Sequence, residues 1–217
     1  MSHSLKSLTG FILALALGLS LAGPAAADLK SDILSGIEQK YANKSFSAHF
    51  EQATRLTALD ITEIAKGKAQ FSHPGKMRWT YESPDRHEII TNSKALWIYR
   101  PGENQVMQGN AALFFQSGSG GAFLSDITRI RKDFTIDLGK TGNNFAELLL
   151  VPKQESTDLA SIRMTIDLPS HEIHVVVTEN PYGDTTRFFF TNIRFAAPDP
   201  KVFDFIIPED AEVIEMN

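Results

Sequence analysis

The chain of 217 residues contains no cysteine. This absence excludes disulfide bonds and a lipid-modified cysteine, so the fold depends on its core alone. Positive charge is also scarce, because 21 Lys and Arg stand against 26 Asp and Glu. The resulting net charge of −5 disfavours nucleic acid as a partner and offers no attraction to anionic lipid headgroups. Any contact with lipid is therefore expected to be apolar.

Long hydrophobic runs are missing from the chain after its first 21 residues. The one run, Phe11 to Leu21, follows the positive charge of Lys6 and precedes the small residues Ala25-Ala26-Ala27. It is shorter than the roughly 20 residues that a membrane span requires, and this order of features is typical of a secretory signal peptide. We therefore expect export and removal of residues 1–27.

The sequence also lacks the patterns that indicate catalysis or metal binding. The Ser- and Gly-rich stretch at 116–121 does not match the G-x-S-x-G nucleophile elbow, and we interpret it as a hinge or linker. His171 and His174 are three residues apart, but a strand sends side chains at that spacing to opposite faces. No phosphate-binding or dinucleotide-binding loop is present. We expect no enzymatic activity, no metal and no cofactor.

The spacing of apolar residues predicts a helix, a run of strands, an interruption and a second run of strands. Apolar residues recur every three or four positions over 28–43, as on one face of an amphipathic helix. Segments 110–116 and 121–131 have similar spacing and predict short inserted helices. Alternation with a period of two predicts the strands, which lie around 46–50 and at 61–72, 76–82, 87–91, 96–99, 105–108, 134–138, 145–151, 162–168, 172–178, 185–192 and 203–206.

A run of antiparallel strands this long favours a sheet that curls, because strand twist accumulates and exposed edges are a liability. The helices are the elements available to cover its concave face. We predict an α+β fold with a single domain at 28–217. Its architecture is an incomplete, strongly curved antiparallel β-barrel of about ten strands, covered by the N-terminal helix and short inserted lid helices.

Aromatic residues are frequent on the predicted strand faces, and the chain has 15 Phe. In the stretch KMRWTYES, Met77, Trp79 and Tyr81 point to one side of the strand, and we group Trp97 and Tyr99 with them. Two interpretations stay open. These side chains either fill an ordinary core or line a concave face that leaves room for a ligand.

Five short motifs occur in an order that is more specific than any one of them. They are FSAHFEQ at 46–52, GKAQF at 67–71, PGKMRWTY at 74–81, LWIY at 96–99 and FDFIIP at 203–208, with the spaced Pro84 between the third and the fourth. In this order, they resemble the periplasmic outer-membrane lipoprotein carrier family, LolA. The resemblance implies an incomplete barrel closed by helices, with an apolar cavity for acyl chains, in a protein of the periplasm.

The resemblance also implies partners. Members of the family take acylated lipoproteins from an inner-membrane ABC-type release complex and pass them to an outer-membrane lipoprotein receptor. The absence of cysteine fits the soluble carrier, which we expect to be a monomer, better than the lipid-anchored receptor. His73 departs from the family pattern, because better-known members have an Arg there that latches the lid. We treat His73 as a candidate latch, although it lacks the fork of donors of a guanidinium.

The resemblance and the strand pattern together define the expected site. The acyl-chain cavity is expected to be lined by Phe46, Phe50, Phe71, Met77, Trp79 and Tyr81. The lid is expected to contribute Phe114, Phe123, Leu124 and Ile127. Two alternative functions stay open: a carrier of another lipid, such as a glycolipid, and a periplasmic sensor or interaction domain that reads a peptide on its concave face.

Overall fold

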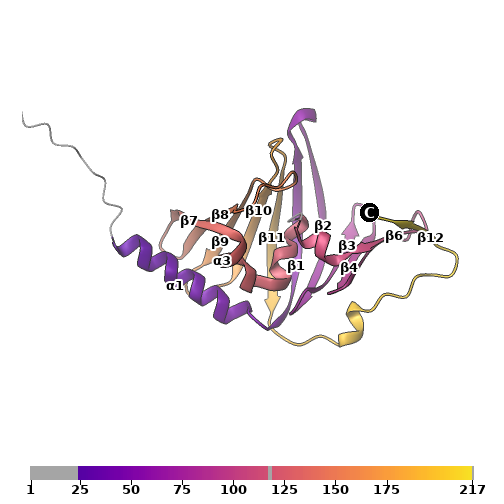
Figure 1. Ribbon diagram of the computed structural model, residues 1–217, viewed down its shortest axis with the longest axis horizontal. Helices are drawn as coiled ribbons and strands as arrows, with labels where there is room; N and C mark the ends of the chain where they lie inside the picture. The colour runs from indigo at the N-terminus through magenta and orange to yellow at the C-terminus, as the bar shows by residue number, and fades with distance from the viewer. Residues whose placement is uncertain (1–23, 117–118, 217) are drawn as a thin grey trace, which may run out of the picture.

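A computed structural model describes residues 24–116 and 119–216, with side chains at 27–115 and 123–216. Its elements form one sheet, an N-terminal helix of 18 residues and several shorter helices (Figure 1). The strands are β1 (Ser45–Leu56), β2 (Ile61–Ser72), β3 (Lys76–Ser83), β4 (His87–Asn92), β5 (Ala95–Arg100), β6 (Gln105–Asn110), β7 (Phe134–Thr141), β8 (Phe145–Pro152), β9 (Ser161–Asp167), β10 (Ile173–Glu179), β11 (Thr185–Arg194) and β12 (Glu212–Glu215). The helices are α1 (Pro24–Tyr41), η1 (Thr57–Leu59), α2 (Ala111–Gln116), η2 (Ser119–Arg129), α3 (Ile130–Asp133) and η3 (Pro200–Phe203).

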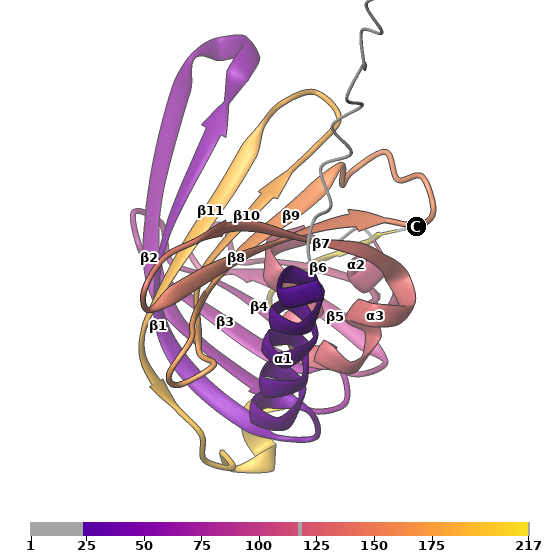
Figure 2. The ribbon, with the colours of Figure 1, turned by 90° about the vertical axis from the view of Figure 1, so that its left-hand side faces the viewer.

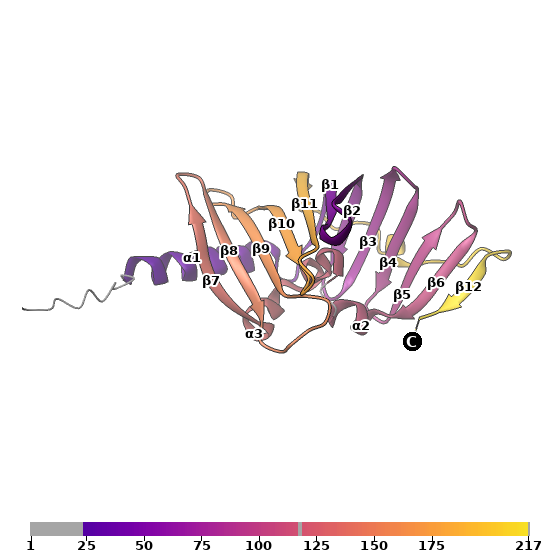
Figure 3. The same cartoon turned by 90° about the horizontal axis from the view of Figure 1, so that it is seen from above.

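The sheet has the strand order β12-β6-β5-β4-β3-β2-β1-β11-β10-β9-β8-β7. All pairs are antiparallel except β12 with β6, which run parallel. Within the described residues the edge strands β7 and β12 do not pair, and Figure 3 shows the strongly bent, open sheet from above. The predicted fold class is confirmed, with twelve strands instead of about ten.

Helices cover the concave face of the sheet (Figure 2). The apolar stripe of α1 places Ile33, Ile37 and Tyr41 in the core, as its spacing predicts, although the helix begins at Pro24 and not at residue 28. None of the helices in the described part has both the length and the hydropathy that crossing a bilayer requires. The predicted signal peptide lies largely outside the described residues, and the predicted hinge does so in part, at 117–118.

The inserted segment that follows α2 is mostly a 3₁₀-helix, η2, and not the α-helix that its spacing predicts. Leu124, Ile127 and Ile130 are all buried, at intervals of three residues. Because a 3₁₀-helix has three residues per turn, this spacing stacks the three side chains on one side of it. The apolar face was therefore predicted correctly and the helix type was not.

The C-terminal segment covers the convex face and corrects two predictions. Residues 203–206 do not form a strand; η3 ends at Phe203, whose ring is buried. Trp97 is paired with Ile90, and Ile90 with Arg78, so these three side chains share one face of the sheet. Trp79 follows Arg78 in β3, and its side chain therefore points to the other face. Trp97 and Tyr99 contact Phe205 instead, with ring centroids 6.0 and 5.4 Å away. The grouping of Trp97 and Tyr99 with Trp79 is wrong.

Candidate functional site

The six predicted wall residues lie together on the concave face of β1, β2 and β3. Strand pairing aligns Phe46 with Phe71 and Phe71 with Met77 across the three strands. Two residues further along, Ala69 of β2 lies opposite Trp79. At the end of this face, Phe50 and Tyr81 flank Gly67. The sequence pattern therefore identified one continuous surface.

Aromatic rings fill this surface. Phe46 stacks on Phe71 with ring centroids 4.5 Å apart, and Phe71 meets Trp79 edge-on at 5.5 Å. Phe188 and Phe190 of β11, which were not among the predicted site residues, extend the cluster from the other side of β1. Their alternation on one strand was visible in the sequence, but only the pairing of β11 with β1 places them beside Trp79.

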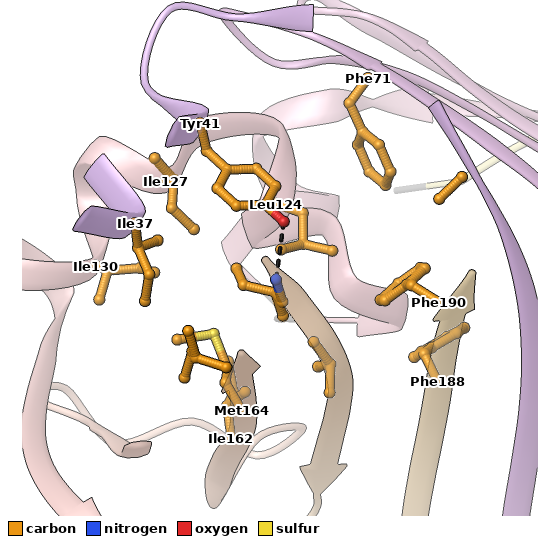
Figure 4. Packing of buried hydrophobic residues seen from close by; sticks show 14 of the residues in the cluster. Ile37, Tyr41, Phe71, Leu124, Ile127, Ile130, Ile162, Met164, Phe188 and Phe190 are labelled. Carbon is orange, nitrogen blue, oxygen red and sulfur yellow. Dashed lines mark hydrogen bonds between the residues drawn. The ribbon is translucent and has the colours of Figure 1, made fainter. Parts of the chain in front are cut away.

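The predicted lid residues contact the same cluster. Leu124 and Ile127 are buried, and Phe114 and Phe123 are partly buried against the core. Figure 4 shows Ile127 beside Ile37 and Tyr41 of α1, and Leu124 between Tyr41 and the aromatic rings of the sheet. Every wall residue is at most 7% exposed, so the helices are closed over the wall. An acyl chain would enter this space by displacing the lid side chains, and the cavity and lid roles remain predictions.

The candidate latch His73 lies in the turn between β2 and β3. Its Nδ1 is 3.6 Å from the Oδ1 of Asp126 in η2, an ion pair when the imidazole is protonated. In the same turn, the Gly75 N–H donates a hydrogen bond to the carbonyl of Ser125 at 3.3 Å. Thr91 of β4 holds the other side of the turn by donating to the Gly75 carbonyl at 2.9 Å. The turn therefore joins the sheet to η2, and the latch role of His73 stays a prediction.

Helix α1 is fixed to the sheet by several polar contacts. Near its N-terminal end, the Lys30 ammonium donates to the Ile136 carbonyl at 2.9 Å. At its C-terminal end, the Tyr41 hydroxyl accepts a hydrogen bond from the Ile173 N–H at 2.9 Å (Figure 4). Lys40 pairs with Glu172 at 3.2 Å. Burial, partly offset by this hydrogen bond, raises the pKa of Tyr41 well above its usual range.

A separate cavity of about 430 Å³ opens at the rim of the concave face, beside Tyr81. The Tyr81 hydroxyl donates to the Gln52 Oε1 at 2.7 Å, and its ring stacks on His87 with centroids 4.0 Å apart. Burial raises the pKa of Tyr81 well above its usual range. The residues that line the cavity are Gln52, Thr54, Glu63, Ile64, Ala65, Tyr81, Pro84, Asp85 and His87.

This rim cavity was not predicted, because its lining comes from four separate strands and a turn, which only the folded sheet brings together. Three of its residues had a sequence signal: Gln52 ends the FSAHFEQ motif, Tyr81 ends the PGKMRWTY motif, and Pro84 belongs to the same family pattern. In the described part of the chain, this cavity included, His, Asp and Glu form no group of three or more that could hold a metal ion.

Known proteins with similar sequences are named as carriers. The family described as outer membrane lipoprotein carrier protein LolA matches residues 42–206. An outer-membrane lipoprotein carrier protein of Chromobacterium violaceum is 28% identical over 214 residues, which cover 97% of this chain and 98% of the relative. One of Pseudomonas aeruginosa is 27% identical over 210 residues, with 95% and 97% covered.

Solved structures share the fold at low identity. An uncharacterized conserved protein from Thermus thermophilus superimposes with a TM-score of 0.55 and 12% identity, over 87% of this chain and 99% of that one. A DUF1329 family protein from Desulfovibrio piger gives a TM-score of 0.51 and 10% identity, over 82% and 97%. These likenesses concern the fold alone. The family match, which spans most of the chain from 42 to 206, carries the assignment: this chain belongs to the outer membrane lipoprotein carrier protein LolA family.

Proposed function

We propose that this protein is a periplasmic carrier that holds the acyl chains of lipoproteins against its concave face. The observation that supports the proposal most strongly is the position of the aromatic wall. It lies on the sheet and is covered by a short, separately inserted segment, η2, and not by another strand. Apolar contacts with a segment of this kind can be exchanged for contacts with a fatty acyl chain.

The energy of such a site suits transport through water. Burial contributes about 0.8 kcal/mol per methylene group, so one long acyl chain favours the site over water by roughly 10 kcal/mol. In the closed form, Leu124 and Ile127 of the lid are buried in the same apolar cluster as the wall residues. An acyl chain that replaces them gains only the difference between its contacts and theirs. Uptake and release can then be nearly balanced, as a transfer between two membranes requires.

The polar contacts of the helices favour η2 as the moving element. Helix α1 is held by Lys30, Lys40 and Tyr41, whereas among the described residues the turn at His73 and Gly75 contacts η2 through the 3.6 Å pair of His73 with Asp126 and one hydrogen bond. Ion pairs that solvent reaches, as it partly reaches this one, contribute at most about 1 kcal/mol. We therefore assign the lid role to η2 and the latch role to the pair of His73 and Asp126.

The names of the related carriers and the predicted signal peptide support a location in the periplasm. In this proposal, cargo comes from an inner-membrane release complex and is passed to an outer-membrane receptor. Affinity capture from an envelope extract, followed by mass spectrometry, tests the cargo. Recovery of acylated proteins supports the proposal, and recovery of free glycolipid alone would favour a carrier of another lipid.

Acyl binding itself is tested with a brominated fatty acid, which quenches tryptophan on contact. The chain has 2 Trp, and the Trp97→Phe variant leaves only Trp79 in the proposed wall. We expect saturable quenching of Trp79. In the same background, Phe123→Glu should weaken binding at least tenfold, because it places a charge beside the acyl chain.

The matched control is Phe189→Glu, which changes an exposed Phe next to Phe188 in the sequence but outside the cluster. The affinity of this control for the brominated fatty acid should equal that of the Trp97→Phe protein. Thermal unfolding checks that both variants are folded. If Trp79 is not quenched in the folded parent, the wall is an ordinary core and the carrier proposal is wrong.

A further inference from the structure

Strand β2 extends beyond its neighbour β3 and exposes part of its edge. Its pairing with β1 runs from Ile61, opposite Leu56, to Ser72, whereas its pairing with β3 ends at Lys66, opposite Ser83. Among the described residues, no strand pairs with the outer edge of 61–65. Figure 2 shows the β1–β2 hairpin standing out from the rest of the sheet. A row of backbone donors and acceptors is therefore available to an added strand.

The rim cavity lies directly beside this free edge. Glu63, Ile64 and Ala65 of β2 line it on one side, and Pro84 and Asp85 of the β3–β4 turn line it on another. Five strand residues span about 17 Å, which is enough for a short antiparallel or parallel pairing. A chain laid along the edge would direct alternate side chains toward the cavity.

Tyr81 joins the cavity to the proposed acyl site. Its ring meets the Phe50 ring edge-on with centroids 4.9 Å apart, and its hydroxyl donates to Gln52, which lines the cavity. Phe50 belongs to the wall, and Gln52 is the next residue of β1 that faces the same side. A polypeptide whose end is buried among the wall residues would leave the site at this point.

The charge of the cavity selects the chemistry of that polypeptide. Glu63 and Asp85 line it, and none of the described lining residues is Lys or Arg. Of the cations near the cavity, Arg55 pairs with Asp60 and Lys66 with Glu51, whereas Arg86 forms no ion pair among the described residues and acts on Glu82, which does not line the cavity. His87 is the remaining titratable lining residue, apart from Tyr81, and its ring is stacked on that tyrosine. The cavity therefore complements a basic side chain.

We propose that the free edge of β2 at 61–65 binds the extended segment that follows the acylated residue of the cargo, as an added strand with a Lys or Arg side chain in the rim cavity. This inference rests on the proposed carrier function and specifies the part of the cargo that is recognised besides its acyl chains. It predicts that cargo proteins with basic residues close to the acylated end bind more tightly than those with acidic residues there.

The test uses synthetic lipopeptides that share one diacylglyceryl-cysteine and differ in the five residues that follow it. We expect the peptide with alternating Ser and Lys to bind at least fivefold more tightly than its Ser and Glu counterpart. Hydrogen exchange of the amides at 61–65 should slow with the Lys lipopeptide and not with a free fatty acid. A Lys lipopeptide with Pro in the middle of the segment should lose this protection, because Pro has no N–H to donate.

A double variant, Glu63→Gln with Asp85→Asn, should remove the preference for Lys over Glu while fatty acid affinity stays unchanged. The matched control, Glu209→Gln with Asp210→Asn, changes two exposed acids that do not line the cavity and should keep the preference. Equal affinity for the Lys and Glu lipopeptides, or unchanged hydrogen exchange of the amides at 61–65, overturns this inference. If fatty acid still binds in that case, the proposed carrier function is not affected. If neither fatty acid nor lipopeptide binds, both are overturned.

Discussion

Gly67 of β2 leaves the space through which the ring of Phe50 reaches across the sheet. A Cβ atom at Gly67 would lie 2.9 Å from two carbons of the Phe50 ring and 2.1 Å from the Thr80 carbonyl oxygen. With only hydrogen there, Phe50 contacts both Trp79 and Tyr81, with ring centroids 4.9 Å away in each case. The packing of the aromatic wall therefore depends on the absence of a side chain at Gly67.

The substitution Gly67→Ala should destabilise the protein by about 1–3 kcal/mol, because a crowded core accommodates an extra methyl group only by shifting its neighbours. Here one neighbour is backbone, which cannot rotate away. Urea denaturation measures the change. Gly102→Ala is the matched control, since its added Cβ would meet no atom within 4 Å, and it should change stability little. Equal stability of the two variants would contradict the close packing at Gly67.

The pair of His73 and Asp126 should control how readily the lid opens. Asp126→Asn removes the acid of the pair and should speed fatty acid association and dissociation two- to fivefold, since ion pairs that solvent partly reaches contribute at most about 1 kcal/mol. Stopped-flow quenching of Trp79 measures both rates. The control is Glu103→Gln, which breaks an exposed pair with Arg100 in the β5–β6 turn and should leave the rates unchanged. Unchanged rates in Asp126→Asn would mean that this pair is not a latch.

Two buried tyrosines should respond differently to loss of the hydroxyl. Tyr41→Phe leaves the buried N–H of Ile173 without its acceptor, and we expect a loss of about 1–3 kcal/mol in the free energy of unfolding. Tyr81→Phe affects only Gln52, which also donates to Thr54, and should have a smaller effect. Thermal and urea unfolding of the pair measure the difference. A larger loss in Tyr81→Phe would show that the rim contact is the stronger one.

The free energy of unfolding of the protein should decrease at alkaline pH because of the same two tyrosines. Burial raises the pKa of Tyr41 and of Tyr81 in the folded state, so the unfolded chain loses these protons first, from pH about 10. Their contribution is fully present below that pH and is lost as pH rises toward the folded pKa values. Urea unfolding between pH 8 and 11 measures the decline, which should be shallower in Tyr81→Phe. An identical pH dependence in this variant would contradict the raised pKa.

Patterns within single segments determined much of this protein. Alternation placed Met77, Trp79 and Tyr81 on one face of β3, and spacing by three placed Leu124 and Ile127 on one face of the inserted segment. Both patterns depend on backbone geometry over a few residues, which the amino-acid order fixes directly. The order of the five motifs identified the family, which the match over 42–206 confirms.

Relations between segments were decided only by the tertiary structure. Alternation in β5 predicted that Trp97 and Tyr99 share a face, but the register with β4 decides that this face is the convex one. Pairing of β11 with β1 brings Phe188 to Trp79, and the early end of β3 creates both the free edge of β2 and the cavity beside it. Register, sheet curvature and strand length are set by the summed packing of distant residues. A period of two carries no information about them, because it is the same on either face of a sheet.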